Sequence, residues 1–282
     1  MFLRSLALRR SLRMRSFTID SATLCEPSLI VFDKDGTLID FNLMWGGWVE
    51  SQAWKLEMIA ELPVREKLFD SMGYDWIRRS IKSKGAMCCT PMRDLYKLAV
   101  QVLVDEGVEP PQALKTVQQV WSVPDPIASC RPLGDLHGIF QTLTKMNIKI
   151  GVCTTDCRVP TVATLEHLGL MDMVDCISCG DDGLPAKPAA EHIWTMCKKT
   201  GCDPHNTIMV GDTSTDMRLG QNAGCGLSIG VLGGASSLED LAQDADVLVP
   251  SLDRVVKVLF QYGQQARRHQ PASMHHHKID YA

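Results

Sequence analysis

The sequence predicts an α/β fold in which a Rossmann-like parallel sheet is flanked by helices and carries an inserted all-helical domain. Three observations predict it. An apolar run, Leu29–Phe32, ends at a polar turn, as expected of a strand that is buried on both faces of a parallel sheet. From residue 130 onward, further apolar runs alternate with helical patterns. Between these parts, the apolar pattern of residues 43–129 is helical throughout, which indicates a separate module.

The domain limits follow from the same patterns. We expect residues 20–42 and 130–262 to form the sheet-containing core and residues 43–129 to form the helical insertion. Residues 263–282 form a polar tail that contains His275–His277, which we expect to be irrelevant to function or part of an added sequence. No internal repeat is visible.

The expected elements of the insertion come first in chain order. Apolar residues approximate one face of a first helix and include Trp45, Trp48, Val49, Leu56 and Ile59. A short helix over 64–72 follows. Thr90 and Pro91 are typical of a helix start, and that helix is expected to end at Gly107. A fourth helix is predicted over 110–121.

The core resumes near Pro132 with a helix over 134–146, which leads into a strand over 148–153. Regular βα units are expected to follow. A helix is predicted over 188–200, ends at Gly201 and lies between two apolar runs. The expected strands of this part span 174–178, 207–211, 226–230 and 247–249. The connection rules then favour a parallel sheet.

Polar residues directly follow several of these strands. Asp33 and Asp35 follow the first strand, and Thr154 follows the strand over 148–153. Lys187 precedes a proline-led helix, and Asp212 follows a further strand, with Asp216 one helical turn later. Ligands of open α/β sheets bind at the carboxyl ends of the strands, so these side chains are expected to share one site.

These residue types suit phosphoryl transfer. A carboxylate such as Asp33 can attack phosphorus, and a second carboxyl group, Asp35, can protonate the departing oxygen and later activate water. Charge on the phosphoryl oxygens needs a hydroxyl donor and a cation, for which Thr154 and Lys187 are the candidates. Asp33 and Asp212 are oxygen ligands suited to Mg²⁺, and Asp216 is placed to orient metal-bound water.

In these motifs the chain resembles the haloacid dehalogenase superfamily over residues 28–250, and within it the phosphoglycolate phosphatase-like branch. The resemblance implies that the insertion is a helical cap domain, that the backbone carbonyl of Asp35 also binds Mg²⁺, and that Lys187 steadies the nucleophile. Because members that cleave carbon–halogen bonds lack the second aspartate, the presence of Asp35 disfavours dehalogenation. Lys34 stands where many relatives carry an aromatic residue, and Thr155 where an Asn is common.

The function that this resemblance implies is Mg²⁺-dependent hydrolysis of small phosphomonoesters through an aspartyl-phosphate, with 2-phosphoglycolate as the best single substrate candidate. A phosphomutase of the β-phosphoglucomutase type needs the same residues and is the alternative. A catalytically silent binding or scaffold protein is a third hypothesis, which predicts a broken site. No expected catalytic position is missing here.

Composition limits the partners. The formal net charge of −4 does not indicate binding to nucleic acid, which is itself negatively charged. No apolar stretch approaches the roughly 20 residues that span a bilayer. A small phosphorylated metabolite is therefore the expected partner, and the sequence does not indicate an oligomeric state.

Residues 1–19 differ from the rest, because five arginines lie among Leu and Ser and no acidic residue precedes Asp20. This composition predicts an organelle transit peptide and a mitochondrial location, with a plastid location or a disordered basic tail in the cytosol as alternatives. Of the 11 cysteines, Cys176 and Cys179 have C-x-x-C spacing. No second pair with zinc-like spacing accompanies them, which favours buried, reduced thiols.

The insertion contains candidates for substrate recognition. Aromatic residues at helical spacing are more often core than pocket lining, and those considered are Trp45, Trp48, Trp54, Tyr74 and Trp76. Arginine pairs bidentately with a carboxylate, and the candidates are Arg65, Arg78, Arg79 and Arg93. The sequence does not choose among them.

Overall fold

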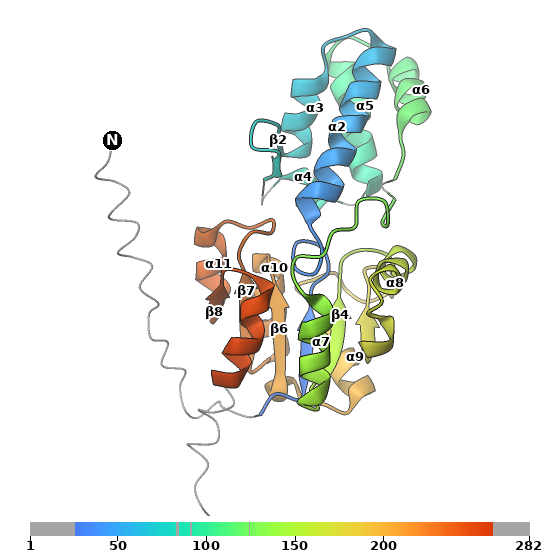
Figure 1. Ribbon diagram of the computed structural model, residues 1–282. Coiled ribbons are helices and arrows are strands. Elements are labelled where there is room, and N and C mark those ends of the chain that lie inside the picture. The colour runs from blue at the N-terminus through green and yellow to red at the C-terminus, as the bar shows by residue number, and fades with distance from the viewer. Residues whose placement is uncertain (1–25, 83–84, 91, 124, 262–282) are drawn as a thin grey trace, which may run out of the picture.

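The computed structural model describes residues 26–82, 85–90, 92–123 and 125–261 (Figure 1). A six-stranded parallel sheet with helices on both faces forms the core, and a mainly helical domain lies beyond the carboxyl ends of its strands. The predicted α/β class is confirmed. The segment 1–19, predicted to be a transit peptide, and the tail 263–282 lie outside the described residues.

The sheet has the strand order β5-β4-β1-β6-β7-β8, and all of its neighbouring strands are parallel. Phe32, the last residue of β1, lies opposite Val152 of β4 and Val210 of β6. The three central strands therefore end at nearly the same level. The strand bounds are β1 Leu29–Phe32, β4 Lys149–Cys153, β5 Cys176–Ser178, β6 Thr207–Gly211, β7 Leu227–Val231 and β8 Val247–Val249.

Alternate side chains of β1 point to the two faces of the sheet. Ile30 and Phe32 pack on one face, where the ring of Phe32 stacks on that of Phe140 at 5.4 Å between centroids. Leu29 and Val31 pack into a second cluster on the other face. Both faces of β1 are covered, which explains its uninterrupted apolar sequence. The helices of the core are α7 Leu136–Lys145, α8 Arg158–His167, α9 Glu191–Thr200, α10 Ser214–Ala223 and α11 Leu238–Asp244, with short 3₁₀ turns η2 Met171–Met173, η3 Pro204–Asn206 and η4 Leu252–Arg254.

The inserted domain, which we call the cap, has its own apolar core and a short antiparallel pair that the sequence analysis did not predict. Asp75 closes this pair, because its Oδ1 accepts hydrogen bonds from the backbone N–H groups of Ile77 and Arg78. Its strands have two residues each, which is too short for an alternating pattern to show in the sequence. The cap elements are α2 Phe41–Ala60, α3 Arg65–Met72, β2 Tyr74–Asp75, β3 Ser80–Ile81, α4 Ala86–Cys89, α5 Met92–Asp105 and α6 Pro110–Val120.

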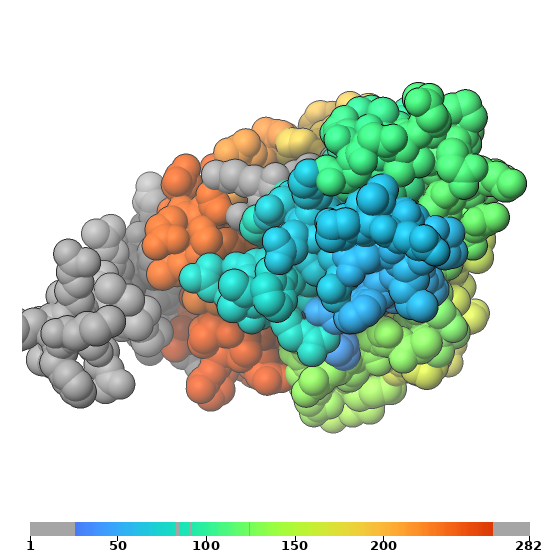
Figure 2. Space-filling view, turned by 90° about the horizontal axis from the view of Figure 1, so that it is seen from above, coloured from blue at the N-terminus to red at the C-terminus, as the bar shows by residue number. Residues whose placement is uncertain are grey.

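The two connections between core and cap run side by side. The backbone N–H of Asp40 donates to the carbonyl of Arg131 at 2.8 Å, and that of Leu133 donates to the carbonyl of Leu38 at 2.9 Å. Asp40 also caps the first turn of α2 by accepting from Leu43 N at 3.0 Å. The chain therefore passes within a few residues from the end of β1 into the cap, which covers this end of the core when seen from above (Figure 2).

The expectation that the cap aromatics are core residues is confirmed for Trp48 and Tyr74, which are only 7% and 2% exposed and belong to the cap core. It is wrong for Trp54 and Trp76, which are 53% and 54% exposed. The expectation of buried thiols is confirmed. Cys176 and Cys179 are buried free thiols. Among the described residues, no helix combines the length and apolar character that a membrane crossing requires.

We expect Trp48 to be a principal stabiliser of the cap. Its indole N–H donates to the carbonyl of Ser122 at 2.6 Å, and its ring packs edge-on against Trp121. Trp48→Ala should lower the free energy of unfolding by about 3–5 kcal/mol, as for other buried aromatics. Trp76→Ala, at a residue that is 54% exposed, should change it by no more than about 0.5 kcal/mol. Urea unfolding followed by circular dichroism measures both, and equal losses would contradict the assignment.

Candidate active site

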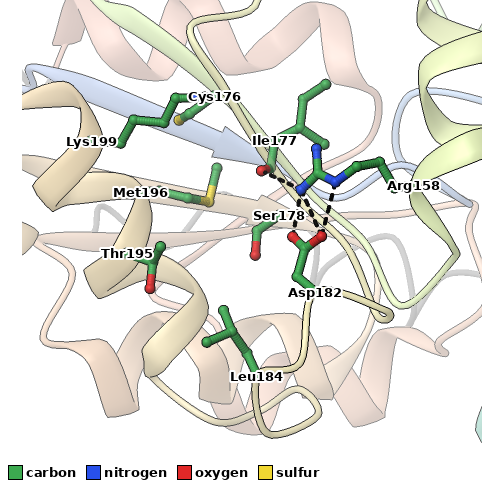
Figure 3. A pocket seen from close by; sticks show the side chains of 9 residues that line it. All are labelled: Arg158, Cys176, Ile177, Ser178, Asp182, Leu184, Thr195, Met196 and Lys199. Carbon is green, nitrogen blue, oxygen red and sulfur yellow. Dashed lines mark hydrogen bonds and ion pairs between the residues drawn. The ribbon is translucent and has the colours of Figure 1, made fainter.

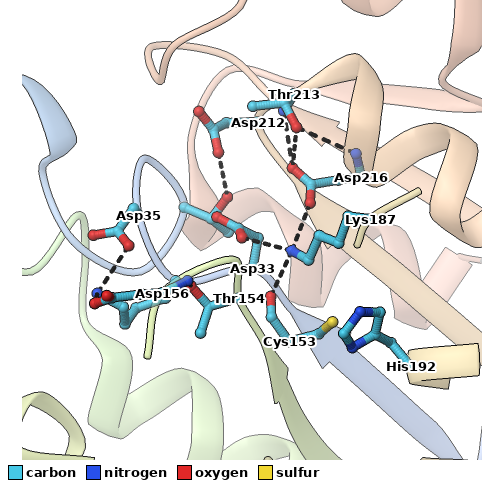
Figure 4. Close-up of polar contacts among 12 residues, drawn as sticks. Asp33, Asp35, Cys153, Thr154, Asp156, Lys187, His192, Asp212, Thr213 and Asp216 are labelled. Atoms are coloured by element: carbon cyan, nitrogen blue, oxygen red, sulfur yellow. Dashed lines mark hydrogen bonds and ion pairs between the residues drawn. The ribbon is translucent and has the colours of Figure 1, made fainter. Parts of the chain in front are cut away.

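Asp33 and Lys187 form the centre of a polar cluster at the carboxyl end of β1 (Figure 4). The ammonium group of Lys187 donates to Asp33 Oδ1 at 2.8 Å, to Asp216 Oδ1 at 2.9 Å and to the carbonyl oxygen of Cys153 at 2.6 Å. The lysine side chain is 2% exposed. Residues 154 positions apart in the chain therefore meet in one buried ion-pair network.

His192 supports the loop that carries Lys187, and the sequence analysis did not identify it. Its Nε2 lies 2.8 Å from the carbonyl oxygen of Pro185, and its Nδ1 lies 2.8 Å from the hydroxyl of Ser178. Burial lowers the pKa of His192, which favours the neutral ring. Because a carbonyl only accepts, Nε2 donates to Pro185 and Nδ1 accepts from Ser178. The only feature of the sequence that could have pointed to His192 is its position near the start of the helix that follows Lys187.

Asp212 is held by partners from two further segments. Thr37 Oγ1 donates to its Oδ1 at 3.0 Å, and the backbone N–H of Ala235 donates to its Oδ2 at 2.6 Å. Gly36 and Gly234 lie against the same carboxylate, since a Cβ on either would come within 2.2 Å of Oδ2. Gly36 also has φ +89°, so both the backbone conformation and the close approach require glycine there. Thr37 and Ala235 are contacts that the sequence analysis did not assign.

Asp216 has contacts beyond those expected from its spacing. Its Oδ2 accepts from the backbone N–H and the hydroxyl of Thr213 in a capping box at the start of α10. Its Oδ1 accepts from Lys187. Both oxygens are therefore engaged by protein donors, and the side chain positions the lysine directly.

The charges of this cluster do not balance without a further cation. Carboxylate oxygens of Asp33, Asp212 and Asp216 lie within 4.8 Å of one another, and all three residues are buried. Lys187 supplies a single positive charge. Burial raises the pKa of Asp33 well above its usual value, and burial together with Asp216 raises that of Asp212 to about 7. Hard carboxylate oxygens with excess negative charge fit a divalent cation such as Mg²⁺.

Asp35 belongs to a second ion-pair group beside the first. Lys34 Nζ lies 2.8 Å from Asp35 Oδ2 and 3.1 Å from Asp156 Oδ2. Although burial disfavours the charged form, the two carboxylates outweigh it and raise the pKa of Lys34. The other oxygen of Asp35, Oδ1, is buried and has no hydrogen-bond partner among the described residues. Sequence reasoning did not assign Lys34 or Asp156 to the site.

Thr154 lies at the end of β4 in the same cluster, where it is 1% exposed. Its backbone N–H donates to the carbonyl of Ser178 at 2.9 Å, and its Oγ1 accepts from Asp156 N at 3.1 Å. The hydroxyl proton of Thr154 is thus available as a donor. The structure brings all six residues expected from the motifs to this edge of the sheet, and Figure 4 shows them together.

The candidate arginines of the cap all have acidic partners. Arg65 pairs with Glu57 and stacks on Trp54, with the guanidinium carbon 3.9 Å from the ring centroid. The other three pairs are Arg78 with Asp75, Arg79 with Glu50, and Arg93 with Asp94. Trp45 contacts the apolar clusters of both domains, and its buried indole N–H has no partner among the described residues.

A separate cavity of about 370 Å³ lies beside β5 and α9 and contains none of the six motif residues (Figure 3). Arg158 on its rim pairs with Asp182 at 2.6 Å. Asp182 also lies near Cys179 and Asp181. Arg158 offsets one of these two carboxylates, and both acidic residues are exposed, so this group carries no argument for a metal site.

Comparisons with known proteins agree with this site. Residues 30–229 match the family model of the haloacid dehalogenase-like hydrolases. A phosphoglycolate phosphatase of Neisseria gonorrhoeae is 30% identical over 82% of this chain and 89% of its own length. One of Agrobacterium fabrum is 32% identical over 46% of this chain, and this match spans only 56% of the relative.

A solved structure has the same fold. The crystal structure of a predicted phosphoglycolate phosphatase from Haemophilus somnus superposes with a TM-score of 0.60 over 83% of this chain and 99% of that chain, at 16% identity. The family match covers most of the chain, from β1 through most of β7. The protein is a member of the haloacid dehalogenase-like hydrolase family.

Proposed function

We propose that this protein is a Mg²⁺-dependent phosphatase that hydrolyses small phosphomonoesters through an aspartyl-phosphate on Asp33. The observation that carries the proposal is the buried network in which Lys187 bridges Asp33 and Asp216. One ammonium group among three carboxylates suits a site that receives a divalent cation and an anionic phosphoryl group. The family match supports hydrolysis as the reaction class.

In the first half-reaction, an oxygen of Asp33 attacks phosphorus while the bond from phosphorus to the leaving oxygen breaks. Asp35 Oδ1 gives its proton to that oxygen, so the product leaves as a neutral alcohol. In the second half-reaction, water attacks the phosphorus of the aspartyl-phosphate and gives a proton to Asp35. Asp33 is then regenerated and phosphate departs.

The remaining residues bind and orient the phosphoryl group. Lys187 limits the rotation of Asp33, and its charge offsets negative charge on the phosphoryl oxygens. Thr154 offers its hydroxyl proton to one of those oxygens. Asp33, Asp212 and the backbone carbonyl of Asp35 would hold Mg²⁺, with Asp216 close by. The ion, when bound, would neutralise charge as phosphorus is transferred.

As the substrate we propose 2-phosphoglycolate. Support comes from the relatives of Agrobacterium fabrum and Neisseria gonorrhoeae, which carry the name phosphoglycolate phosphatase, while other matching relatives carry the name pyrophosphatase. The cap covers the site and is the part of the chain that contacts the remainder of a substrate. A mutase of the β-phosphoglucomutase type would use the same residues and differs by excluding water from the intermediate.

The two aspartates of the first motif should give different defects. Asp33→Asn should abolish turnover and formation of the covalent phosphoenzyme, because no nucleophile remains. Asp35→Asn should lower kcat about 10²–10⁴-fold and leave Mg²⁺ binding intact, because it removes only the acid and base. Phosphate release from a panel of phosphomonoesters, including 2-phosphoglycolate, sugar phosphates and nucleotides, measures both. Near-normal rates for Asp35→Asn would exclude Asp35 as the acid. Sugar-phosphate isomerisation without phosphate release would identify a mutase.

Mg²⁺ should stabilise the protein more at pH 8 than at pH 6. In the metal-free protein the pKa of Asp212 is about 7 and its usual value is 3.8. The folded state therefore binds more protons than the unfolded state, and this group contributes more stability as pH falls from 8 to 6. A metal ion competes with that proton, so Mg²⁺ affinity should be about tenfold weaker at pH 6.

Thermal unfolding with and without Mg²⁺ at the two pH values measures this linkage. Asp212→Asn should abolish both the Mg²⁺-induced rise in Tm and its pH dependence. The matched control is Asp172→Asn, at an exposed aspartate in η2 remote from the site, and it should retain both. A Tm rise that is the same at both pH values would contradict Asp212 as a ligand with a raised pKa.

A further inference from the structure

Lys34 is a buried cation that the phosphatase mechanism leaves without a role. The residue is 1% exposed and lies between two aspartates. Its ammonium group contacts Asp35 Oδ2 at 2.8 Å and Asp156 Oδ2 at 3.1 Å. These three side chains form a bridge between the loop after β1 and the loop after β4.

The Asp156 end of this bridge is firmly anchored. Asp156 Oδ1 accepts from the backbone N–H of Cys157 at 2.7 Å, and its carbonyl accepts from Gly180 N at 2.8 Å. Its own N–H donates to Thr154 Oγ1. Gly180 makes this approach possible, because a Cβ there would lie 2.2 Å from the carbonyl oxygen of Thr155. Asp156 therefore has little freedom to move, and neither has the ammonium group bound to it.

The Asp35 end is asymmetric. Oδ2 is bound to Lys34, whereas the buried Oδ1 has no partner among the described residues. Asp35 precedes Gly36, whose positive φ places it in a tight turn. Among the described residues, no contact other than that with Lys34 would fix the rotation of the Asp35 carboxyl group. With it, one oxygen is held and the other is left for proton transfer.

Stability alone does not explain a lysine in this place. Desolvating an ammonium group costs several kcal/mol, and replacing buried ion pairs by apolar side chains is often neutral or stabilising. Apolar side chains at all three positions would fill the same space without that desolvation cost. The geometry suits a lysine whose function is to orient Asp35.

We propose that Lys34 is a positioning residue for Asp35. Lys34 is itself held by Asp156, and it holds Oδ2 of Asp35. Oδ1 of Asp35 then gives the proton in the first half-reaction and receives it in the second. The inference rests on the proposed phosphatase function and assigns a further residue to it. Lys34 itself neither gains nor loses a proton, and it does not touch the substrate.

A comparison of leaving groups tests the inference. An alkyl phosphate releases a strongly basic alkoxide that needs the proton of Asp35, whereas p-nitrophenyl phosphate releases a phenolate that does not. The value of kcat/KM reports steps up to formation of the phosphoenzyme. Lys34→Met should lower kcat/KM about 10–100-fold for the alkyl phosphomonoester that the wild type hydrolyses fastest, and less than about threefold for p-nitrophenyl phosphate.

Three variants serve as comparisons. Lys34→Arg should restore part of the alkyl activity, because it keeps the charge. Asp156→Asn should show a smaller loss with the same substrate selectivity, because it removes only the anchor. Lys149→Met removes a lysine at the opposite end of β4, where Nζ bonds the carbonyl of Thr200, and both activities should be unchanged. The ratio of the two kcat/KM values does not depend on the fraction of folded protein.

Equal losses with both substrates, or no loss with either, would overturn the role of Lys34. The Asp35→Asn variant distinguishes a wrong role for Lys34 from a wrong proposed function. If that variant shows the selective alkyl loss and Lys34→Met does not, the mechanism stands and the inference falls. If Asp35→Asn loses both activities equally, or the wild type hydrolyses no phosphomonoester, the proposed mechanism falls and takes the inference with it.

Discussion

The ion-pair network around Lys187 is the interaction on which the rest of the site depends. A single buried ammonium group holds Asp33 and Asp216 at hydrogen-bond distance and also binds the end of β4 through the carbonyl of Cys153. Three carboxylates so close together would repel one another strongly at low dielectric. The lysine reduces that repulsion only in part, and the remaining negative charge makes the cluster receptive to a metal ion. The site's chemistry therefore follows from an unbalanced charge that the fold keeps out of water.

The fold creates this imbalance through the register of its central strands. β1, β4 and β6 end at the same level, so the residues that follow them emerge side by side. β1 is also the strand at which the chain order reverses across the sheet, with β4 on one side and β6 on the other. The crevice of an open α/β sheet lies at such a point. Because the chain enters the cap almost directly after β1, the loop that carries Asp33 and Asp35 leads straight into the covering domain.

The supporting contacts show that the site depends on more residues than the six expected from the motifs. His192 and Ser178 fix the loop of Lys187, Thr37 and Ala235 fix Asp212, and Lys34 with Asp156 fixes one oxygen of Asp35. Apart from Lys34, none of these residues stands out in the sequence, because a histidine on a helix or a threonine after a glycine is ordinary by itself. They gain meaning only when the segments that carry them are brought together.

The sequence by itself determined the order of strands and helices, the helical insertion and the six motif residues, because an apolar run buried on both faces and a polar residue at its end are local patterns. It did not predict the β2–β3 pair, whose strands are too short to show a period. Only the tertiary structure decided which oxygen of Asp35 is free, that Asp216 binds Lys187, and that all four candidate arginines of the cap already have acidic partners. Those facts depend on distances between segments far apart in the chain, and local pattern carries no information about such distances.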